Sequence, residues 1–217
     1  IDGRVLPRES LPPDAGTDGI VLRTFRAVMG SAPSLVDLQV LDRMIERTRV
    51  SHPVVVQRAL DRVEPEDVLM IVRGFLRERI RVPPLHALLG LLAEDRRFHD
   101  PAERSLSAER ARVALRDHWL HAEVAGLRGL GPLRVVRITP DAESYLASVA
   151  VDGEAGPIAH VDPSRLDVWL SAIREAAPEG KGALVLVASS RHRARLAALV
   201  RGVTPRIPVL SVDEMQH

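Results

Sequence analysis

Apolar residues between positions 34 and 123 recur every three or four residues, which is the spacing of amphipathic helices. Leu38, Leu41 and Ile45 form one such stripe, and we expect Ser34 to cap this helix with Asp37 in its first turn. The same reasoning predicts further helices over residues 20–29, 53–60, 65–76, 85–93 and 107–123. The stretch therefore predicts a domain of short antiparallel helices.

The spacing of the apolar residues changes after the Gly-rich segment at residues 126–132. The continuous apolar run Ala183–Ala188 is typical of a strand covered on both faces, and an Arg-rich helix follows it as far as Gly202. Ser189 and Ser190 are the expected caps of that helix, and a second strand at about Pro208 completes a right-handed parallel crossover. The remaining predicted elements are strands at 133–138 and 157–160 and helices at 141–149 and after Asp162-Pro163.

The predicted fold class is α plus α/β: an all-helical domain followed by a small α/β domain with a mostly parallel sheet. We assign residues 1–19 to a linker or a remnant of a preceding domain, 20–130 to the helical domain and 131–217 to the α/β domain. The chain opens at Ile1 without an initiator Met, so we interpret it as a fragment of a longer protein.

The amino-acid composition excludes some classes of function but does not identify one. Thirty basic and 29 acidic residues leave a net charge of +1, which gives no electrostatic argument for nucleic acid or an anionic membrane. The absence of cysteine excludes disulfides and thiolate chemistry and fits a reducing compartment. No stretch reaches the roughly 20 apolar residues that a membrane span needs. The residues alone predict a binding module.

Three segments could suggest chemistry, and each has an ordinary structural explanation. His118 and His121 have a chelating spacing, but no third ligand is evident, so we predict no metal site. Gly180-Lys181-Gly182 lacks the first Gly and the Ser/Thr of a phosphate-binding loop. Ser189 and Ser190 beside His192 are explained by helix capping rather than by a nucleophile and its base. We therefore predict no enzyme activity and no cofactor.

Four segments form a recognisable series along the chain: Gln39–Met44, Arg79–Glu94, Glu109–Leu115 and Pro208–Glu214. Together, and in this order, they resemble the cytoplasmic part of the export-gate proteins of bacterial flagellar and virulence type III secretion. Gln39–Met44 resembles their Q-x-L-L-D-x-L stretch, and Arg79–Glu94 resembles G-V-S-I-R-D-L-x-x-I-L-E-A-L-A-E. Glu109–Leu115 resembles T-E-x-V-R-x-A-L, and Pro208–Glu214 resembles L-P-V-L-S-x-x-E. Pro83-Pro84 departs from the family's Arg-Asp or Arg-Asn, which indicates a divergent member.

The resemblance implies the third and fourth subdomains of such a gate, on the cytoplasmic face of the bacterial inner membrane. Family members form a nine-membered ring, largely through the third subdomain, and attach to the membrane through an N-terminal part that is missing here. The implied partners are further copies of the chain, the stalk of the export ATPase, the switch protein and chaperone–substrate complexes. The resemblance does not separate flagellar from virulence systems.

Charged helix faces provide the candidate contact residues, although such faces often serve only solubility. A ring needs head-to-tail contacts, and we expect the predicted third-subdomain helices to supply them. The candidates for this contact are Asp42, Arg43, Glu46, Arg47, Arg73 and Arg77. Arg191, Arg193 and Arg195 on the last long helix are the candidates for docking an acidic partner, because Arg binds carboxylates in bidentate fashion.

A second function stays open at this point. A soluble regulatory or ligand-binding α/β module would share the crossover fold without any part in protein export. Membrane spans upstream in the full gene, or self-association of the chain, would favour the export gate. A hydrolase or nucleotide enzyme has no motif in its favour.

Overall fold

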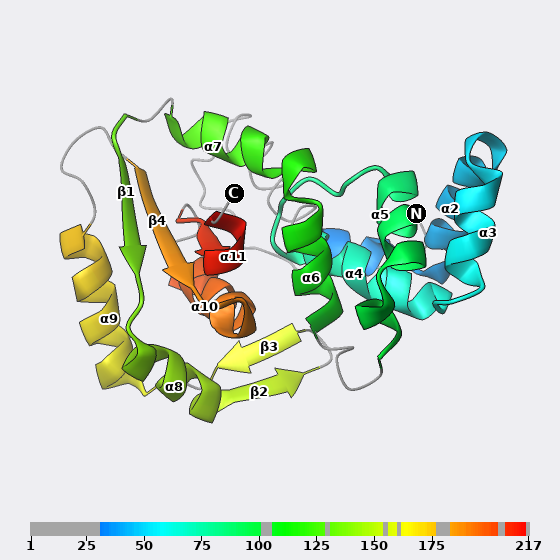
Figure 1. The fold of residues 1–217 in the computed structure, drawn as a ribbon. Helices are drawn as coiled ribbons and strands as arrows, with labels where there is room; N and C mark the ends of the chain where they lie inside the picture. The colour runs from blue at the N-terminus through cyan, green and yellow to red at the C-terminus, as the bar shows by residue number, and fades with distance from the viewer. Residues whose placement is uncertain are drawn as a thin grey trace, which may run out of the picture. The chain divides into compact units, whose positions relative to one another are not determined.

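A computed structural model describes residues 31–100, 106–128, 131–153, 156–159, 162–176, 183–203 and 207–215 (Figure 1). The chain folds into two compact units, the first ending at Trp119 and the second beginning at Leu120. The predicted boundary between residues 130 and 131 lies one helix further along the chain. The predicted linker over residues 1–19 and the predicted helix over 20–29 lie outside the described residues.

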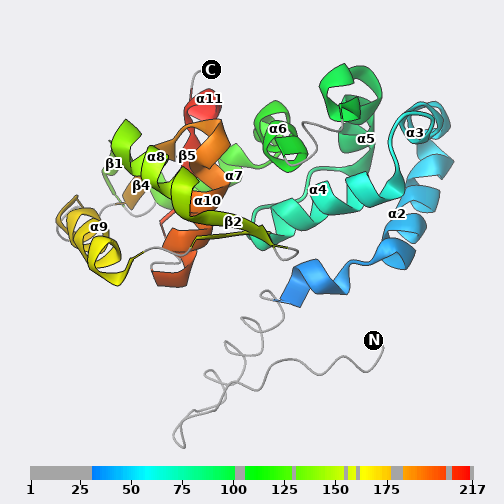
Figure 2. The same ribbon diagram turned by 90° about the horizontal axis from the view of Figure 1, so that it is seen from below.

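The first unit is helical, as its apolar periodicity predicts. Its elements are α2 (Leu38–Ser51), α3 (Pro53–Leu60), α4 (Pro65–Arg77), α5 (Leu85–Glu94), the 3-10 helix η1 (Arg96–His99), α6 (Ser107–Ala114) and the 3-10 helix η3 (Arg116–His118). Helices α2 and α3 lie side by side in both views (Figures 1 and 2). The buried stripes of these helices form the core around Leu41, Val56, Val72 and Leu88, whose side chains are almost fully removed from water.

Helix α2 begins four residues later than its expected cap. Asp37 is the N-cap, and its carboxylate accepts a hydrogen bond of 2.9 Å from the backbone N–H of Val40. Ser34 instead lies in a separate helical stretch at residues 31–35, where its hydroxyl donates to the carbonyl of Ser31. The prediction of Ser34 as the cap is wrong, because a carboxylate closer to the helix satisfies the free N–H groups.

The long helix predicted from Ser107 to Glu123 is broken into three pieces. Helix α6 ends at Ala114, η3 follows, and a new helix α7 (Leu120–Arg128) begins the second unit. Trp119 at the break is almost fully buried, and its indole N–H donates to the carbonyl of Arg112 at 3.0 Å. The break places a large aromatic ring in the core, which local helix propensity does not encode.

The second unit contains the predicted parallel sheet. Strands β1 (Leu133–Arg137), β4 (Ala183–Ala188) and β5 (Val209–Ser211) lie in the order β1-β4-β5, and both pairings are parallel. The central strand β4 has all six residues buried, as its unbroken apolar run predicts. Helix α10 (Ser190–Val203) connects β4 to β5, and α11 (Val212–Met215) follows β5.

Helices α8 (Pro140–Val149) and α9 (Pro163–Ala176) lie between β1 and β4 in the chain. Leu146 of α8 packs with Leu186 of β4 and Leu196 of α10 in the core of this unit. A hairpin of β2 (Ala150–Gly153) and β3 (Gly156–Ala159) follows α8. The strand expected at residues 157–160 corresponds to β3, whereas the sequence pattern does not predict β2. The fold class is confirmed, with this antiparallel hairpin beside the parallel sheet.

Candidate functional site

The exposed face of α2 carries four of the predicted contact residues. Asp42, Arg43, Glu46 and Arg47 are all exposed. Glu46 forms an ion pair of 3.2 Å with Arg49 on the same helix, so its charge is partly used within α2. An exposed pair at this spacing contributes only about 0.3–0.5 kcal/mol, and the face stays open to water.

Arg73 and Arg77 on α4 are less accessible than their pattern suggested. Both are half-buried, and the Nε of Arg73 donates to the carbonyl of Val36 at 3.0 Å. Burial, followed by the neighbouring charge of Arg73, lowers the pKa of Arg77 from its ordinary value. Arg73 therefore holds the segment just before α2 against α4, which leaves less of its side chain for an outside contact.

The three predicted docking arginines on α10 have different environments. Arg191 is exposed and Arg195 is half-buried, but the side chain of Arg193 is only 1% exposed. The prediction that Arg193 lies on a docking face is therefore wrong. It is two residues from Arg191, so a face that exposes Arg191 turns Arg193 toward the interior. Only Arg191 and Arg195 stay as candidates for docking.

Polar groups from three elements meet at the start of α10. The carboxylate of Glu143 on α8 accepts a 2.7 Å hydrogen bond from the backbone N–H of Ser189, and the hydroxyl of Ser190 bonds the carboxylate of Asp213 on α11. The hydroxyl of Ser189 is buried and has no hydrogen-bond partner among the described residues. Neither hydroxyl therefore caps α10 as predicted, because carboxylates from other elements occupy this helix terminus.

The same region holds His192, whose buried Nδ1 atom has no hydrogen-bond partner in the part of the chain that the structure describes. Burial lowers the pKa of His192 from its ordinary value, while the charge of Glu143 acts in the opposite direction and those of Arg195 and Arg191 add to the lowering. Because the Ser189 hydroxyl and His192 Nδ1 both lack partners, they do not bond each other. The arrangement holds no activated serine.

The other segments considered for chemistry give no site. His118 lies in η3 and His121 in α7, so the broken helix does not place them on one helical face. Among the described residues, no group of three or more His, Cys, Asp or Glu side chains is placed to hold a metal ion. The segment Gly180-Lys181-Gly182 lies outside the described residues.

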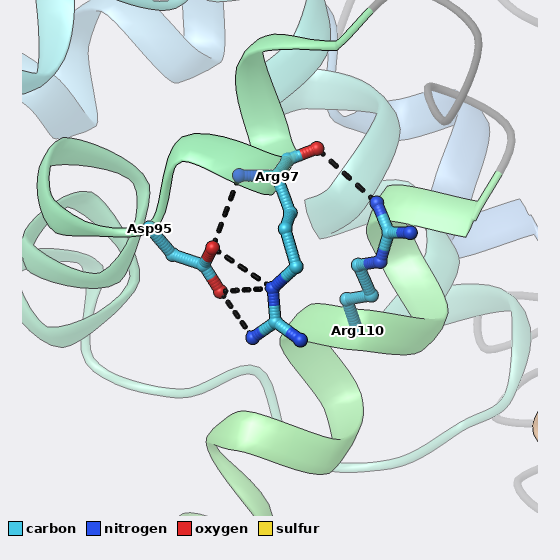
Figure 3. A network of polar contacts seen from close by, with 3 residues as sticks. All are labelled: Asp95, Arg97 and Arg110. Carbon is cyan, nitrogen blue, oxygen red and sulfur yellow. Dashed lines mark hydrogen bonds and ion pairs between the residues drawn. The ribbon is translucent and has the colours of Figure 1, made fainter.

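The turn after α5 is closed by a local charge network (Figure 3). The carboxylate of Asp95 accepts hydrogen bonds from the backbone N–H of Arg97 at 3.0 Å and from its guanidinium at 2.6 Å. These bonds, chiefly the one from the Arg97 side chain, lower the pKa of Asp95. Arg110 on α6 donates to the carbonyl of Arg97 at 3.1 Å, so the network fastens the turn to α6.

A second network joins the C-cap of α4 to α6, and no sequence pattern predicts it. Arg112 is buried, and its guanidinium donates to the carboxylate of Glu78 at 2.7 Å. The same guanidinium lies 4.0 Å from the centre of the Trp119 ring. Arg112 belongs to Glu109–Leu115, one of the segments that resemble the export-gate proteins. In the structure, its guanidinium connects α6 to Glu78 at the end of α4.

Among the described residues of the first unit, the most exposed large hydrophobic side chains lie where α2 meets α3. Val50 is 88% exposed and Val54 is 60% exposed, whereas the other exposed large hydrophobic residues described in this unit are Leu35 and Leu38, at 42% and 37%. The sequence pattern does not predict this exposure, because Val50 and Val54 flank a helix junction where periodicity assigns no face.

Among the described residues, no helix is long and apolar enough to cross a membrane. The model of the FHIPEP family matches residues 17–217. No curated protein matches the chain.

Solved structures share the fold at low sequence identity. Nonameric EPEC SctV-C, solved by cryo-EM, is 19% identical with a TM-score of 0.69, over 91% of this chain and 59% of that one. In the complex of the Chlamydia pneumoniae CdsV and CdsO proteins, the matching chain is 22% identical with a TM-score of 0.69, over 91% and 57%. The Shigella flexneri MxiA protein is 16% identical with a TM-score of 0.67, over 93% and 65%. The chain thus spans less than two thirds of the length of these relatives.

Proposed function

Because the chain belongs to the FHIPEP family of type III secretion export gates, we propose that it assembles into a cytoplasmic ring that receives export partners and helps order substrate secretion. The observation that carries this proposal is the likeness in fold, over about nine tenths of the chain, to a protein solved as a nonamer. The first unit supplies the contact between copies in this proposal. The second unit supplies the docking surface.

The exposed charges of α2 support the assembly part of the proposal. Asp42, Arg43 and Arg47 project from one helix and make no side-chain ion pair or hydrogen bond with the described residues. Charges left open in this way can pair with a neighbouring copy, and they set the register and the rate of association more than its affinity. Arg73 and Arg77 contribute less, because their side chains are half-buried.

Arg191 and Arg195 support the docking part. They lie one helical turn apart near the start of α10, where Arg191 is exposed, and an acidic helical partner such as the stalk of the export ATPase would fit them. The likeness to CdsV, whose complex with CdsO has been solved, favours a docked partner on this family's cytoplasmic part. The switch protein and chaperone–substrate complexes are the further partners that we propose.

Secretion by the cells that make the protein tests the function. Replacing the native gene with a version lacking residues 31–217 should abolish export of type III substrates into the medium, and restoring the segment should return it. An antibody against the chain should detect a protein in the membrane fraction that is heavier than 23.8 kDa. Unchanged secretion would contradict the proposal and favour the regulatory module.

Docking is tested separately with Arg191→Glu/Arg195→Glu. Reversing both charges should remove binding of the export ATPase stalk in a pull-down, while circular dichroism stays unchanged. Arg137→Glu, on an exposed part of β1, is the matched control and should bind normally. Retained binding by the double variant would remove α10 from the docking surface.

A further inference from the structure

We propose that β1 binds an extended, acidic segment of a partner protein, which adds to the edge of the sheet as a further strand. The inference goes beyond the docking surface proposed on α10, because it concerns the backbone of a strand rather than the side chains of a helix. In the described three-stranded sheet, β1 and β5 are the two edges and β4 lies between them. Strand β5 has three residues, all buried, whereas four of the five residues of β1 are exposed.

The direction of the backbone groups in β1 follows from its pairing with β4. The N–H of Ala183 donates to the carbonyl of Pro132 at 3.0 Å, so the backbone groups at position 132 point toward β4. Successive residues of a strand point their N–H and C=O groups to opposite sides, and the register with β4 is unbroken over all five residues. The residues whose backbone groups point away from β4 are therefore Leu133, Val135 and Arg137. No described strand pairs with them.

These backbone groups determine the class of partner. Each outward residue offers one donor and one acceptor, and the set repeats about every 6.6 Å along the edge. A second extended backbone matches this repeat, which is the basis of recognition by strand addition. Strand β1 contains no proline, and its unbroken register leaves no bulge that would block the edge. The edge is therefore a template for one further strand.

The side chains of β1 favour a partner segment over a second copy of the same strand. The sequence Leu-Arg-Val-Val-Arg has no acidic residue. Two copies of β1 in one ribbon would bring together two arginines from each copy and no carboxylate, which disfavours that pairing. Arg137 is exposed, and its side chain makes no hydrogen bond or ion pair with the described residues. A carboxylate in the added strand would supply the missing partner.

The apolar side chains define the rest of the segment. Leu133 and Val135 are 42% and 47% exposed, and they lie on the same face of β1 as Arg137 because side chains alternate along a strand. Apolar residues at alternate positions of the added strand would cover both of them. The other face of β1 is already fixed, since Val136 packs against the core of this unit and Arg134 donates to the carbonyl of Ala176 at 2.9 Å. The cost of ordering therefore falls on the partner segment alone.

Peptide binding to the whole 217-residue chain tests the inference. The probe is a fluorescein-labelled peptide of about ten residues, in which valine and threonine alternate between glutamates at both ends. Fluorescence anisotropy should show saturable binding. Val135→Pro removes an N–H that β4 does not use, so the fold should survive while the peptide binds about tenfold more weakly or worse. Val135→Thr keeps that N–H and the branched side chain, and this matched control should keep most of the binding; circular dichroism verifies both folds.

Methylated peptides test the backbone contact without changing the protein. One peptide carries N-methyl groups on its valines and the other carries them on its threonines. Only one edge of the added strand faces β1, so one methylated peptide should lose binding and the other should retain it. Loss with methylated threonine indicates a parallel added strand, and loss with methylated valine an antiparallel one. Equal effects of the two methylations would overturn strand addition.

A charge exchange tests the acidic character of the segment. Lysines in place of the terminal glutamates should weaken binding by up to about fivefold, and Arg137→Glu should reverse this preference. An unchanged preference would overturn the acidic partner. If sedimentation velocity shows that the chain self-associates and that Val135→Pro abolishes this, the edge binds a second copy and the inference is overturned. A chain that binds no peptide also overturns it, whereas the proposed export function is tested separately by secretion.

Discussion

The buried pair of Arg112 and Glu78 should be the strongest single polar contribution to the stability of the first unit. Arg112 bonds Glu78 at 2.7 Å, lies over the ring of Trp119, and has a side chain that is 5% exposed. Replacing Arg112 with Met keeps most of the buried volume and removes the charge. The variant removes the Arg112 guanidinium from the Glu78 carboxylate.

The loss in free energy of unfolding for Arg112→Met follows from the Glu78 carboxylate, which stays in place after its partner is removed. Breaking a buried ion pair by removing one partner costs about 3–5 kcal/mol. The Glu78 side chain keeps 17% of its surface in water, so we expect the lower end, about 3 kcal/mol. Losing the contact with the Trp119 ring adds about 1 kcal/mol. The sum of about 4 kcal/mol is a large fraction of the 5–15 kcal/mol that usually stabilises a domain.

Urea unfolding followed by tryptophan fluorescence measures this loss. The chain has two tryptophans, so a Trp169→Phe background leaves Trp119 to report the first unit alone. Arg43→Met removes an exposed arginine and should change the free energy of unfolding by less than about 0.5 kcal/mol. Pairing Arg112→Met with Glu78→Gln should cost less than the two single changes together. A loss below about 1 kcal/mol for Arg112→Met would refute the reasoning.

Two further predictions concern packing and pH. A Cβ atom at Gly74 would lie 2.8 Å from the Cβ of Ala108. Gly74→Ala should therefore lower the free energy of unfolding by about 1 kcal/mol, because the cost of overpacking outweighs the gain in helix propensity. At Gly90 the nearest atom to an added Cβ is 3.9 Å away, so Gly90→Ala should raise the free energy of unfolding by up to about 1 kcal/mol. Burial lowers the pKa of His192 in the folded protein. The neutral side chain therefore contributes its full stability above the pKa of the unfolded chain, about 6.5. That contribution is lost as the pH falls through the pKa of the folded protein. Trp169 fluorescence during urea unfolding between pH 8 and 5 should show this loss, and His192→Phe should reduce it. The packing argument would be contradicted if Gly74→Ala raised the free energy of unfolding and Gly90→Ala lowered it. The pH argument would be contradicted if His192→Phe had the same pH profile of stability as the wild type.

Periodicity and chain-breaking residues predicted most of the fold. The stripe through Leu41 and Ile45 and the unbroken apolar run of β4 depend on burial, which the order of apolar residues encodes directly. The break at Trp119 depends instead on a contact with Arg112, and residues on either side of the break favour helix. The dipeptide Asp152-Gly153 favours tight turns, but both residues lie within β2, opposite Pro157 and Gly156, so this signal does not mark the turn of the β2–β3 hairpin.

The candidate surfaces were less predictable than the fold. A charge on an amphipathic helix is expected to face water, and Arg43 and Arg47 do so. Arg193 and Arg112 are buried instead. The Glu78 carboxylate and the Trp119 ring that Arg112 contacts lie outside α6, and sequence spacing carries no information about such partners. The exposure of Val50 and Val54 arises from the change of direction between two helices, so neither helical pattern reveals it.

The order of strands in the sheet also bears on how the chain folds as it is made. Strand β1 has β4 as its only partner in the described sheet, with Leu133 opposite Ala183, so about fifty residues must be synthesised between the two. At the usual 5–20 residues per second, β1 waits roughly 3–10 s for its partner. The helices of the first unit, whose contacts are closer in sequence, can form during that interval. Translation speed through residues 138–188 therefore sets how long an unpaired strand is exposed to aggregation.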